Sequence, residues 1–183
     1  MTAPHLSPAE LKALVRTVPD FPHPGIQFRD ITTLIGHHRG MAASVHHLAE
    51  LADAAGAHKI AGMEARGFIF GAALAREFGV GLVLLRKQNK LPGQVTGVNY
   101  ALEYGQDRIE MHDDAVPAGS RVCLVDDLIA TGGTALAGAQ LLRGAGAVVT
   151  QAAFAIDLPD LGGAQRLRAA GITPHSLMAF SGH

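Results

Sequence analysis

The fold of this chain is decided by the stretch VCLVDDLIATGGTALAG at residues 122–138. Four apolar residues indicate a buried strand, and two adjacent aspartates, Asp126 and Asp127, follow at once. Neighbouring carboxylates repel each other, and burying them is costly unless a partner is present. Two threonines then flank a glycine pair, before an alanine-rich segment that predicts a helix. The two acids are therefore either solvated at a strand end or placed to meet a cationic or polyhydroxylic ligand.

Outside this stretch, apolar strands alternate with helical segments over most of the chain. Such alternation predicts an α/β fold, with an open, mainly parallel twisted sheet that helices flank on both faces. Serine and glutamate at positions 7 and 10 predict a capping box for a first helix. We expect strands at 59–63, 80–85, 122–125, 147–156 and 172–180, and further helices at 40–55, 67–78, 134–146 and 162–171.

Two segments break the alternation. The stretch PDFPHPG at 19–25 is too rich in proline for a helix or a strand, and we expect an ordered loop there. Residues 86–116 alternate apolar and polar side chains around Gly105, which predicts a hairpin outside the main sheet.

The composition predicts one globular domain at 1–183 and excludes several classes of protein. The chain has 183 residues, of which 48% are hydrophobic and 17% charged, so a disordered chain is excluded. A formal net charge of −1 argues against a nucleic-acid partner. We see neither a bilayer-spanning run nor a secretory signal, so we expect no membrane partner and a cytoplasmic location, which the single Cys123 also fits. The 10 histidines show no metal-binding spacing.

The aspartate–glycine stretch predicts a site for a phosphorylated sugar. Ligands of parallel sheets bind at the carboxyl ends of the strands, where Asp126 and Asp127 are expected. Their carboxylates can accept hydrogen bonds from sugar hydroxyls. The following turn opens a helix, whose free N–H groups and dipole attract a phosphate. We expect this turn to bind the phosphate through Ala130, Thr131, Gly132, Gly133 and Thr134.

The full pattern resembles the phosphoribosyl-pyrophosphate (PRPP) motif of the type I phosphoribosyltransferases. A glycine pair alone is more often a simple helix cap, but four apolar residues, two acids and T-G-G-T together are much more specific. Further segments are similar to the adenine phosphoribosyltransferase family, and this resemblance runs from about residue 21 to the last strand. These segments are FPHPGIQFRDIT at 21–32, MEARGFIFG at 63–71, RKQNKLPG at 86–93 and YALEYG at 100–105.

The resemblance implies a reaction and an architecture. Adenine and PRPP would give AMP and pyrophosphate, with Mg²⁺ bound through PRPP rather than by protein ligands that can be named from the sequence. The resemblance also implies a homodimer, a base-binding hood at about 1–35 that includes the first helix, and a flexible hairpin lid at about 86–114.

The resemblance also assigns roles to particular residues. Glu103 would manage the proton at N7 of the purine, and Tyr104 would belong to the lid. The pyrophosphate would meet a loop that contains a cis peptide between Glu64 and Ala65, and Lys90 could serve its own site or the neighbouring subunit's. The expected pyrophosphate ligands are Glu64, Ala65, Arg66, Arg86, Lys87 and Lys90, and the expected adenine ligands are Gln27, Phe28 and Arg29.

Two alternative functions remain open at this point. A 6-oxopurine such as hypoxanthine, guanine or xanthine needs a donor to its oxygen, usually a lysine. The segment DLPDLGG at 157–163 has no lysine, which favours adenine. A PRPP-sensing regulator would need a nucleic-acid surface, and the composition gives no sign of one.

Overall fold

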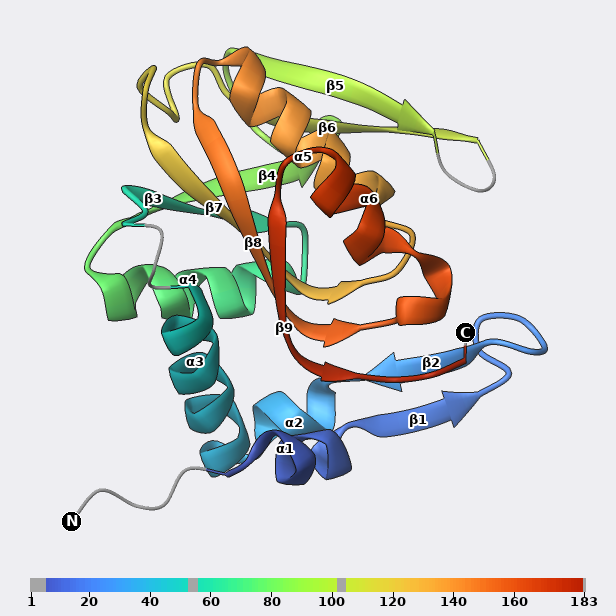
Figure 1. The fold of residues 1–183 in the computed structure, drawn as a ribbon. Helices are drawn as coiled ribbons and strands as arrows, with labels where there is room; N and C mark the ends of the chain where they lie inside the picture. Colours follow the sequence, from blue (N-terminus) through green and yellow to red (C-terminus); the bar gives the residue numbers. More distant parts are fainter. Residues whose placement is uncertain (1–5, 53–55, 102–104, 183) are drawn as a thin grey trace.

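The computed structural model describes residues 6–52, 56–101 and 105–182 of the chain. Its main element is a seven-stranded sheet with the strand order β5-β6-β4-β3-β7-β8-β9 (Figure 1). The strands β3, β4, β7, β8 and β9 are parallel, and β5 and β6 form an antiparallel edge. The predicted α/β fold is therefore confirmed. The strands are β3 (Lys59–Met63), β4 (Gly81–Lys87), β5 (Val95–Ala101), β6 (Gln106–His112), β7 (Arg121–Ile129), β8 (Val148–Asp157) and β9 (Thr173–Ala179).

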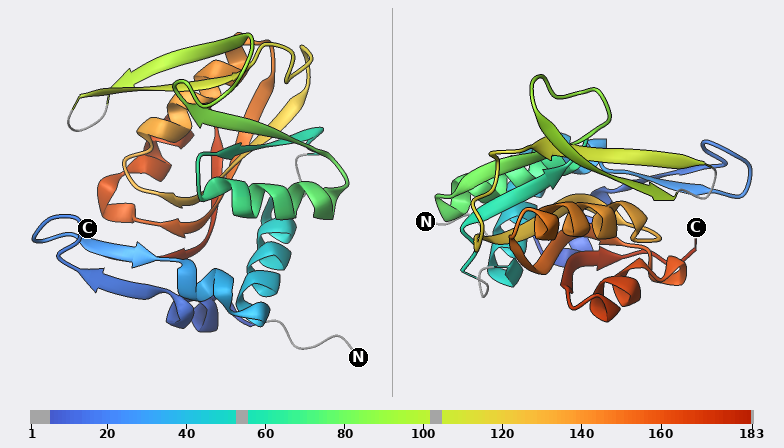
Figure 2. Two further views of the ribbon diagram at one scale, coloured as in Figure 1. Left: turned by 180° about the vertical axis from the view of Figure 1, so that it is seen from behind. Right: turned by 90° about the horizontal axis from the view of Figure 1, so that it is seen from above.

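Helices cover both faces of the sheet, as Figures 1 and 2 show. One buried apolar cluster joins the sheet to α5 and α6, and a second joins it to α1, α3 and α4. Apolar residues of β8 contribute to both clusters, which explains the continuous apolar run at 152–156 of this strand. The helices are α1 (Pro8–Leu14), α2 (Thr32–Gly36), α3 (His38–Ala52), α4 (Gly67–Phe78), α5 (Gly133–Gly144) and α6 (Gly163–Ala169), with a short 3₁₀ helix η2 (Pro159–Leu161) before α6.

The end of β7 differs from the prediction. We expected the strand to stop at residue 125, before the two aspartates, but it continues to Ile129. The reason is long-range pairing, because β7 remains in register with β8 as far as the pair Ile129↔Asp157. Asp126 and Asp127 therefore lie on a strand, where backbone pairing fixes their positions.

The hairpin formed by β5 and β6 is not outside the main sheet, contrary to our prediction. β6 pairs with the end of β4 through Arg86↔Glu110 and Lys87↔Ile109. The free edge of β4 provides the hydrogen-bonding groups for this pairing. β5 continues the sheet beyond β6, with which it pairs from Val95↔His112 to Ala101↔Gln106. Glu103 and Tyr104, which the sequence places between these strands, lie outside the described residues.

The N-terminal segment contains a second, two-stranded antiparallel sheet that the sequence did not predict. It consists of β1 (Arg16–Pro19) and β2 (Gln27–Asp30), and Figure 1 shows it beside the carboxyl end of β9. Pro19, which we had placed in a loop, is the last residue of β1 and pairs with Gln27. A proline is tolerated there because it ends a strand of a two-stranded ribbon.

The helices begin and end close to the predicted positions. The capping box of α1 is confirmed, since the Ser7 N–H donates to Glu10 Oε2 at 2.8 Å and the Glu10 N–H donates to Ser7 Oγ at 3.4 Å. Helix α3 starts two residues earlier than predicted, and α2 was not predicted. In the part of the chain that the structure describes, no helix is both long and apolar enough to cross a membrane.

Candidate active site

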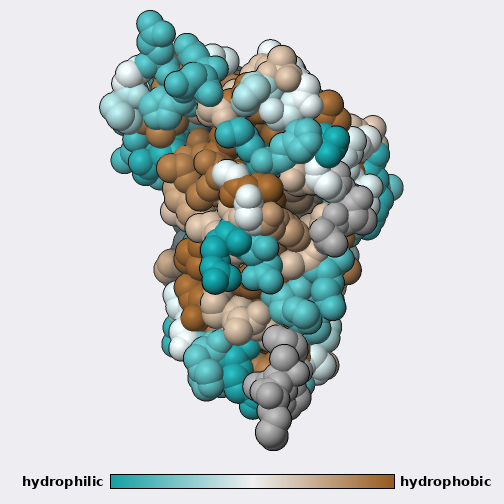
Figure 3. All heavy atoms as spheres, turned by 90° about the vertical axis from the view of Figure 1, so that its left-hand side faces the viewer, coloured by the Kyte–Doolittle hydropathy of each residue, from teal (hydrophilic) through white to brown (hydrophobic). Residues whose placement is uncertain are grey.

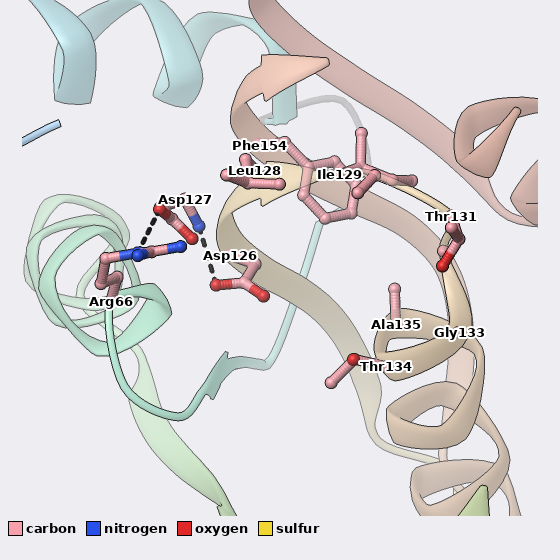
Figure 4. A pocket seen from close by; sticks show the side chains of 12 residues that line it. Arg66, Asp126, Asp127, Leu128, Ile129, Thr131, Gly133, Thr134, Ala135 and Phe154 are labelled. Atoms are coloured by element: carbon pink, nitrogen blue, oxygen red, sulfur yellow. Dashed lines mark hydrogen bonds and ion pairs between the residues drawn. The ribbon is translucent and has the colours of Figure 1, made fainter. Parts of the chain in front are cut away.

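A pocket of about 160 Å³ opens where β7 turns into α5 (Figure 4). Residues 126–135, the aspartates and the glycine turn of the stretch at 122–138, line it together with Arg66 from the start of α4. The lining also includes apolar side chains from β7, α5 and β8 that the sequence reasoning missed. The lining residues are Arg66, Asp126, Asp127, Leu128, Ile129, Ala130, Thr131, Gly132, Gly133, Thr134, Ala135 and Phe154.

The turn from β7 into α5 is held from outside by the start of α6. Gly132 has a φ of 79°, a conformation that a side chain rarely adopts. The Gly163 N–H donates to the Ala130 carbonyl at 3.0 Å, and Arg166 Nη1 donates to the Thr131 carbonyl at 2.7 Å. These contacts fix the shape of the turn, while the first N–H groups of α5 have no acceptor within their own helix. The turn therefore has the features of an anion site.

The two aspartates differ in their surroundings. Asp127 is 3% exposed, and its Oδ2 lies 2.5 Å from Arg66 Nε. Asp126 is half-buried, and its Oδ1 accepts the Asp127 N–H at 2.8 Å. Burial and the neighbouring Asp127 carboxylate raise the pKa of Asp126 well above its ordinary value, although Arg66 acts in the opposite direction. The two carboxylates therefore repel each other when both are ionised. A cation or a set of hydroxyl donors beside them would stabilise the ionised forms.

The loop after β3 has the geometry that the family resemblance implies. The peptide bond between Glu64 and Ala65 is cis, and Arg66 follows at the N-cap of α4. The Glu64 carboxylate accepts hydrogen bonds from the Lys87 N–H at 2.8 Å and from Arg86 Nε at 3.2 Å. Burial acts to raise the pKa of Glu64, but these hydrogen bonds outweigh it and the pKa is lowered. The Glu64 side chain thus anchors Arg86, and only its backbone is left for the predicted pyrophosphate contact.

The basic segment at the end of β4 carries the other predicted pyrophosphate ligands. Lys87 Nζ lies 3.3 Å from Asp107 Oδ2 of β6. The Lys90 carbonyl accepts a hydrogen bond from Arg86 Nη1 at 3.0 Å. Arg66, Arg86 and Lys87 therefore each lie beside a carboxylate.

The predicted base site adjoins the pocket. The Phe28 ring packs edge-on against Phe21, with 5.2 Å between ring centroids, and the Arg66 guanidinium lies 5.5 Å from the Phe28 centroid. Arg66 thus contacts both the predicted base site and the predicted ribose site. Gln27 is held in β2 by pairing with Pro19.

The Arg29 side chain has a structural role in the hood. Its guanidinium donates to Thr17 Oγ1 at 2.6 Å and to the Ser181 carbonyl at 3.0 Å, and it lies over the Phe180 ring. Only the backbone of Arg29 remains for contact with the base, which is the kind of contact that the resemblance implies.

Two polar residues of the hairpin were missed as candidates. The Tyr100 hydroxyl donates to Asp107 Oδ2 at 3.2 Å, and Asp107 in turn pairs with Lys87. Burial raises the pKa of Tyr100, and a hydrogen bond with the Thr134 hydroxyl acts against this rise. Tyr100 lies within YALEYG, so the motif contained a signal for it, whereas the contact of Asp107 depends on strand register.

The comparisons with known proteins agree with this geometry. Residues 32–166 match the family described as "Phosphoribosyl transferase domain". The adenine phosphoribosyltransferase of Erythrobacter litoralis is 67% identical over 174 residues, which cover 95% of this chain and 98% of that protein.

Solved structures extend the likeness to the fold. The adenine phosphoribosyltransferase of Thermoanaerobacter pseudethanolicus superposes with a TM-score of 0.91 at 42% identity, covering 95% of this chain and 100% of that one. The enzyme of Saccharomyces cerevisiae gives a TM-score of 0.86 at 36% identity, covering 93% and 98% of the two chains. The chain therefore belongs to the phosphoribosyltransferase family and, within it, to the adenine phosphoribosyltransferases.

Proposed function

We propose that this chain salvages purine by transferring the 5-phosphoribosyl group of PRPP to N9 of adenine, with release of AMP and pyrophosphate. The observation that carries the proposal is the convergence of three features at one edge of the sheet. These are the acidic pair on β7, the T-G-G-T turn into α5, and Phe28 beside Arg66. The related Saccharomyces cerevisiae enzyme was crystallised with an imino-altritol bisphosphate and adenine.

The β7–α5 segment would hold the ribose 5-phosphate. The turn at 130–134 offers N–H groups and threonine hydroxyls to the phosphate. Asp126 and Asp127 would accept hydrogen bonds from the ribose 2- and 3-hydroxyls. Their negative charge would also favour the oxocarbenium-like character that C1 gains as its bond to pyrophosphate breaks.

The basic side chains around the pocket would bind the leaving group. Arg66, Arg86, Lys87 and Lys90 would neutralise the charges of pyrophosphate. Arg66 is paired with Asp127 and Lys87 with Asp107, so their contacts with pyrophosphate would compete with these carboxylates.

Mg²⁺ would enter together with PRPP. Among the described residues, no group of three or more His, Cys, Asp or Glu side chains could hold a metal ion by itself. The Asp126 and Asp127 carboxylates nevertheless offer the hard oxygen atoms that Mg²⁺ prefers, so an ion carried by PRPP fits beside them. When bound, Mg²⁺ supplies positive charge to the pyrophosphate leaving group.

Base binding and proton transfer would use the hood and the hairpin. Phe28 offers an aromatic face for the purine, and the backbone at Gln27 and Arg29 would provide the polar contacts. Glu103 would act as the general acid–base group for the proton at N7. The lid that includes Tyr104 would exclude water, which could otherwise hydrolyse PRPP.

The chain would act as a cytoplasmic homodimer. Ile69 on α4 and Leu84 on β4 are large apolar side chains that are 37% and 39% exposed. The face at the left of Figure 1, seen directly in Figure 3, shows apolar surface across its middle. Apolar surface of this kind is typical of protein–protein contacts.

A base screen tests the proposed reaction. Purified chain is incubated with Mg²⁺, labelled PRPP and, in separate reactions, adenine, hypoxanthine, guanine or xanthine. We expect AMP from adenine and little product from the three 6-oxopurines. Preferential use of a 6-oxopurine would replace the substrate assignment, and PRPP binding without any turnover would support a sensor instead.

The role of Glu103 is tested with Glu103→Ala. We expect kcat with adenine to fall by about 10²–10⁴-fold, the usual contribution of a general acid–base group, with little change in the affinity for PRPP. Glu50→Ala, which removes an exposed glutamate of α3, serves as the control. A variant that weakens PRPP binding but keeps kcat would remove Glu103 from the chemistry.

A further inference from the structure

Glu110 of β6 is a buried carboxylate that the proposed reaction leaves unused. Within the described residues, the charged side chains that are buried are Asp127, at 3% exposure, and Glu110, at 5%. Asp127 lines the pocket, whereas Glu110 does not. A buried charge is costly, so its partners indicate what it does.

The first partner of Glu110 is the main chain of Asn89, which has an uncommon conformation. Glu110 Oε2 accepts the Asn89 N–H at 3.1 Å. Asn89 has a φ of 63°, in the left-handed region that residues other than glycine rarely occupy. The carboxylate therefore satisfies an N–H whose direction is set by an unusual backbone conformation.

Asn89 lies in the turn that follows β4. The Lys90 N–H donates to the Lys87 carbonyl at 3.3 Å, which closes the turn around Gln88 and Asn89. Glu110 is paired across the sheet with Arg86, so it lies directly beside this turn. The turn carries Lys87 and Lys90, two of the predicted pyrophosphate ligands.

The second partner of Glu110 supplies its counter-charge. Arg108 Nε donates to Glu110 Oε1 at 2.8 Å, and Arg108 Nη1 donates to Asn99 Oδ1 at 3.3 Å. The guanidinium lies against Gly97 of β5, where an added Cβ would come within 2.7 Å of Arg108 Cζ. Glu110 thus connects the turn to a fixed point of the hairpin, through contacts that leave both carboxylate oxygens paired.

We propose that Glu110 is a positioning residue for pyrophosphate binding. Its hydrogen bond to the Asn89 N–H fixes the backbone of the Lys87–Lys90 turn and thereby positions the Lys87 and Lys90 side chains. This inference rests on the proposed function. Its role differs from that of Asp107, which pairs with the Lys87 ammonium and must give it up to a phosphate. Glu110 holds the backbone and keeps its contacts when substrate binds.

Two variants and two ligands test the inference. Binding of Mg²⁺–pyrophosphate and of AMP is measured by calorimetry on the full chain. For Glu110→Ala we expect about tenfold weaker pyrophosphate binding, since the turn loses a charge-assisted hydrogen bond, with AMP affinity within about twofold of the unaltered chain. For Glu110→Gln, which can keep an acceptor for Asn89 but loses the ion pair, we expect about threefold weaker pyrophosphate binding.

Steady-state kinetics give a second readout. In each variant we expect the KM for PRPP to rise by about the factor by which pyrophosphate binding weakens. The KM for adenine and the kcat at saturating PRPP are expected to change by less than about twofold. Asp113→Asn is the matched control, because Asp113 follows the same strand, contacts Thr96 at 2.5 Å, and lies away from the turn. This control is expected to bind pyrophosphate like the unaltered chain.

Several results would overturn the inference. Equal weakening of AMP and pyrophosphate would indicate a general structural role, and unchanged pyrophosphate binding by a folded Glu110→Ala would exclude positioning. If Glu110→Ala does not fold, Glu110→Gln decides, and pyrophosphate affinity equal to that of the unaltered chain would then reject the proposal. An unaltered chain that binds pyrophosphate but forms no AMP would reject the proposed reaction and leave the role of Glu110 standing.

Discussion

At the scale of single residues, the proposed role of Asp126 in ribose binding conflicts with the stability of the fold. Its pKa is raised by burial and by Asp127, so the folded chain favours the protonated form more than the unfolded chain does. The ionised carboxylate therefore destabilises the fold, and this cost appears as the pH rises from the ordinary aspartate range through the raised pKa. The proposed ribose site would use those charges, which would account for an acidic pair that is unfavourable for the fold.

Replacing Asp126 with asparagine separates the two effects. Asparagine retains an oxygen for the Asp127 N–H but removes the charge. We expect Asp126→Asn to raise the melting temperature of the chain, measured without ligand at pH 8. The rise is about 2–4 °C for each kcal/mol gained in the free energy of unfolding, and it is smaller at pH 5. We also expect AMP binding to weaken by about tenfold, because a charged hydrogen-bond acceptor is lost.

The control for this experiment is Asp114→Asn, which changes an exposed carboxylate after β6. Calorimetric unfolding at both pH values and titration with AMP give the two readouts. A lower melting temperature at pH 8 would show that the repulsion between the aspartates is not a cost to the fold. Unchanged affinity for both AMP and PRPP would remove Asp126 from the ribose site.

At the scale of elements, the turn at 130–134, the proposed phosphate site, depends on α6, which is distant in sequence. A Cβ at Gly163 would lie 2.3 Å from the Ala130 carbonyl and 2.8 Å from the Gly132 nitrogen. Neither backbone atom can move without changing the turn at 130–134. The glycine at the start of α6 is therefore needed for close packing against the turn.

Gly163→Ala tests this dependence. We expect AMP binding to weaken by about tenfold or more, because the added methyl displaces the turn at 130–134, the proposed phosphate site. Alanine favours a helix over glycine, so helix propensity alone would predict a more stable chain. Gly144→Ala is the control, since a Cβ at that end of α5 meets nothing within 4 Å. Equal AMP affinity in the two variants, measured by calorimetry, would contradict the packing argument.

At the scale of the whole molecule, the exposed apolar side chains of α4 and β4 predict self-association. Leu84 alternates with the buried Val83 and Leu85, so it points away from the α5 side of the sheet. The neighbouring Leu82 packs against the second apolar cluster, on the side of α4. Leu84 and Ile69 are thus left exposed on the same side of the molecule.

Leu84→Asp tests whether this side is the dimer contact. We expect the unaltered chain to sediment as a dimer and Leu84→Asp as a monomer at micromolar concentration, because a buried unpaired charge opposes association. Val148→Asp is the control, since Val148 is 45% exposed at the start of β8 and is expected to leave the dimer intact. Dimers in both variants would place the interface elsewhere.

The sequence by itself determined the α/β class, most helices and strands of the main sheet, and the segment that forms the pocket. These features depend on local patterns: apolar runs, helical spacing, a capping box at Ser7, and glycines that permit a sharp turn. The family motifs added the reaction and a set of expected ligand residues. Short-range signals of this kind were weakest where pairing decided the structure, as at Pro19 in β1 and at the two aspartates in β7.

Only the tertiary structure decided which charged groups meet. Arg66 faces Asp127, Arg86 faces Glu64, and Lys87 faces Asp107, and each pair joins different elements. The contact between the Glu110 carboxylate and the Asn89 N–H also joins different elements, and no motif indicated it. Such contacts depend on strand register and on burial, which set both the distance between charges and the strength of their interaction. A sequence pattern names the charged groups, but the fold determines their partners.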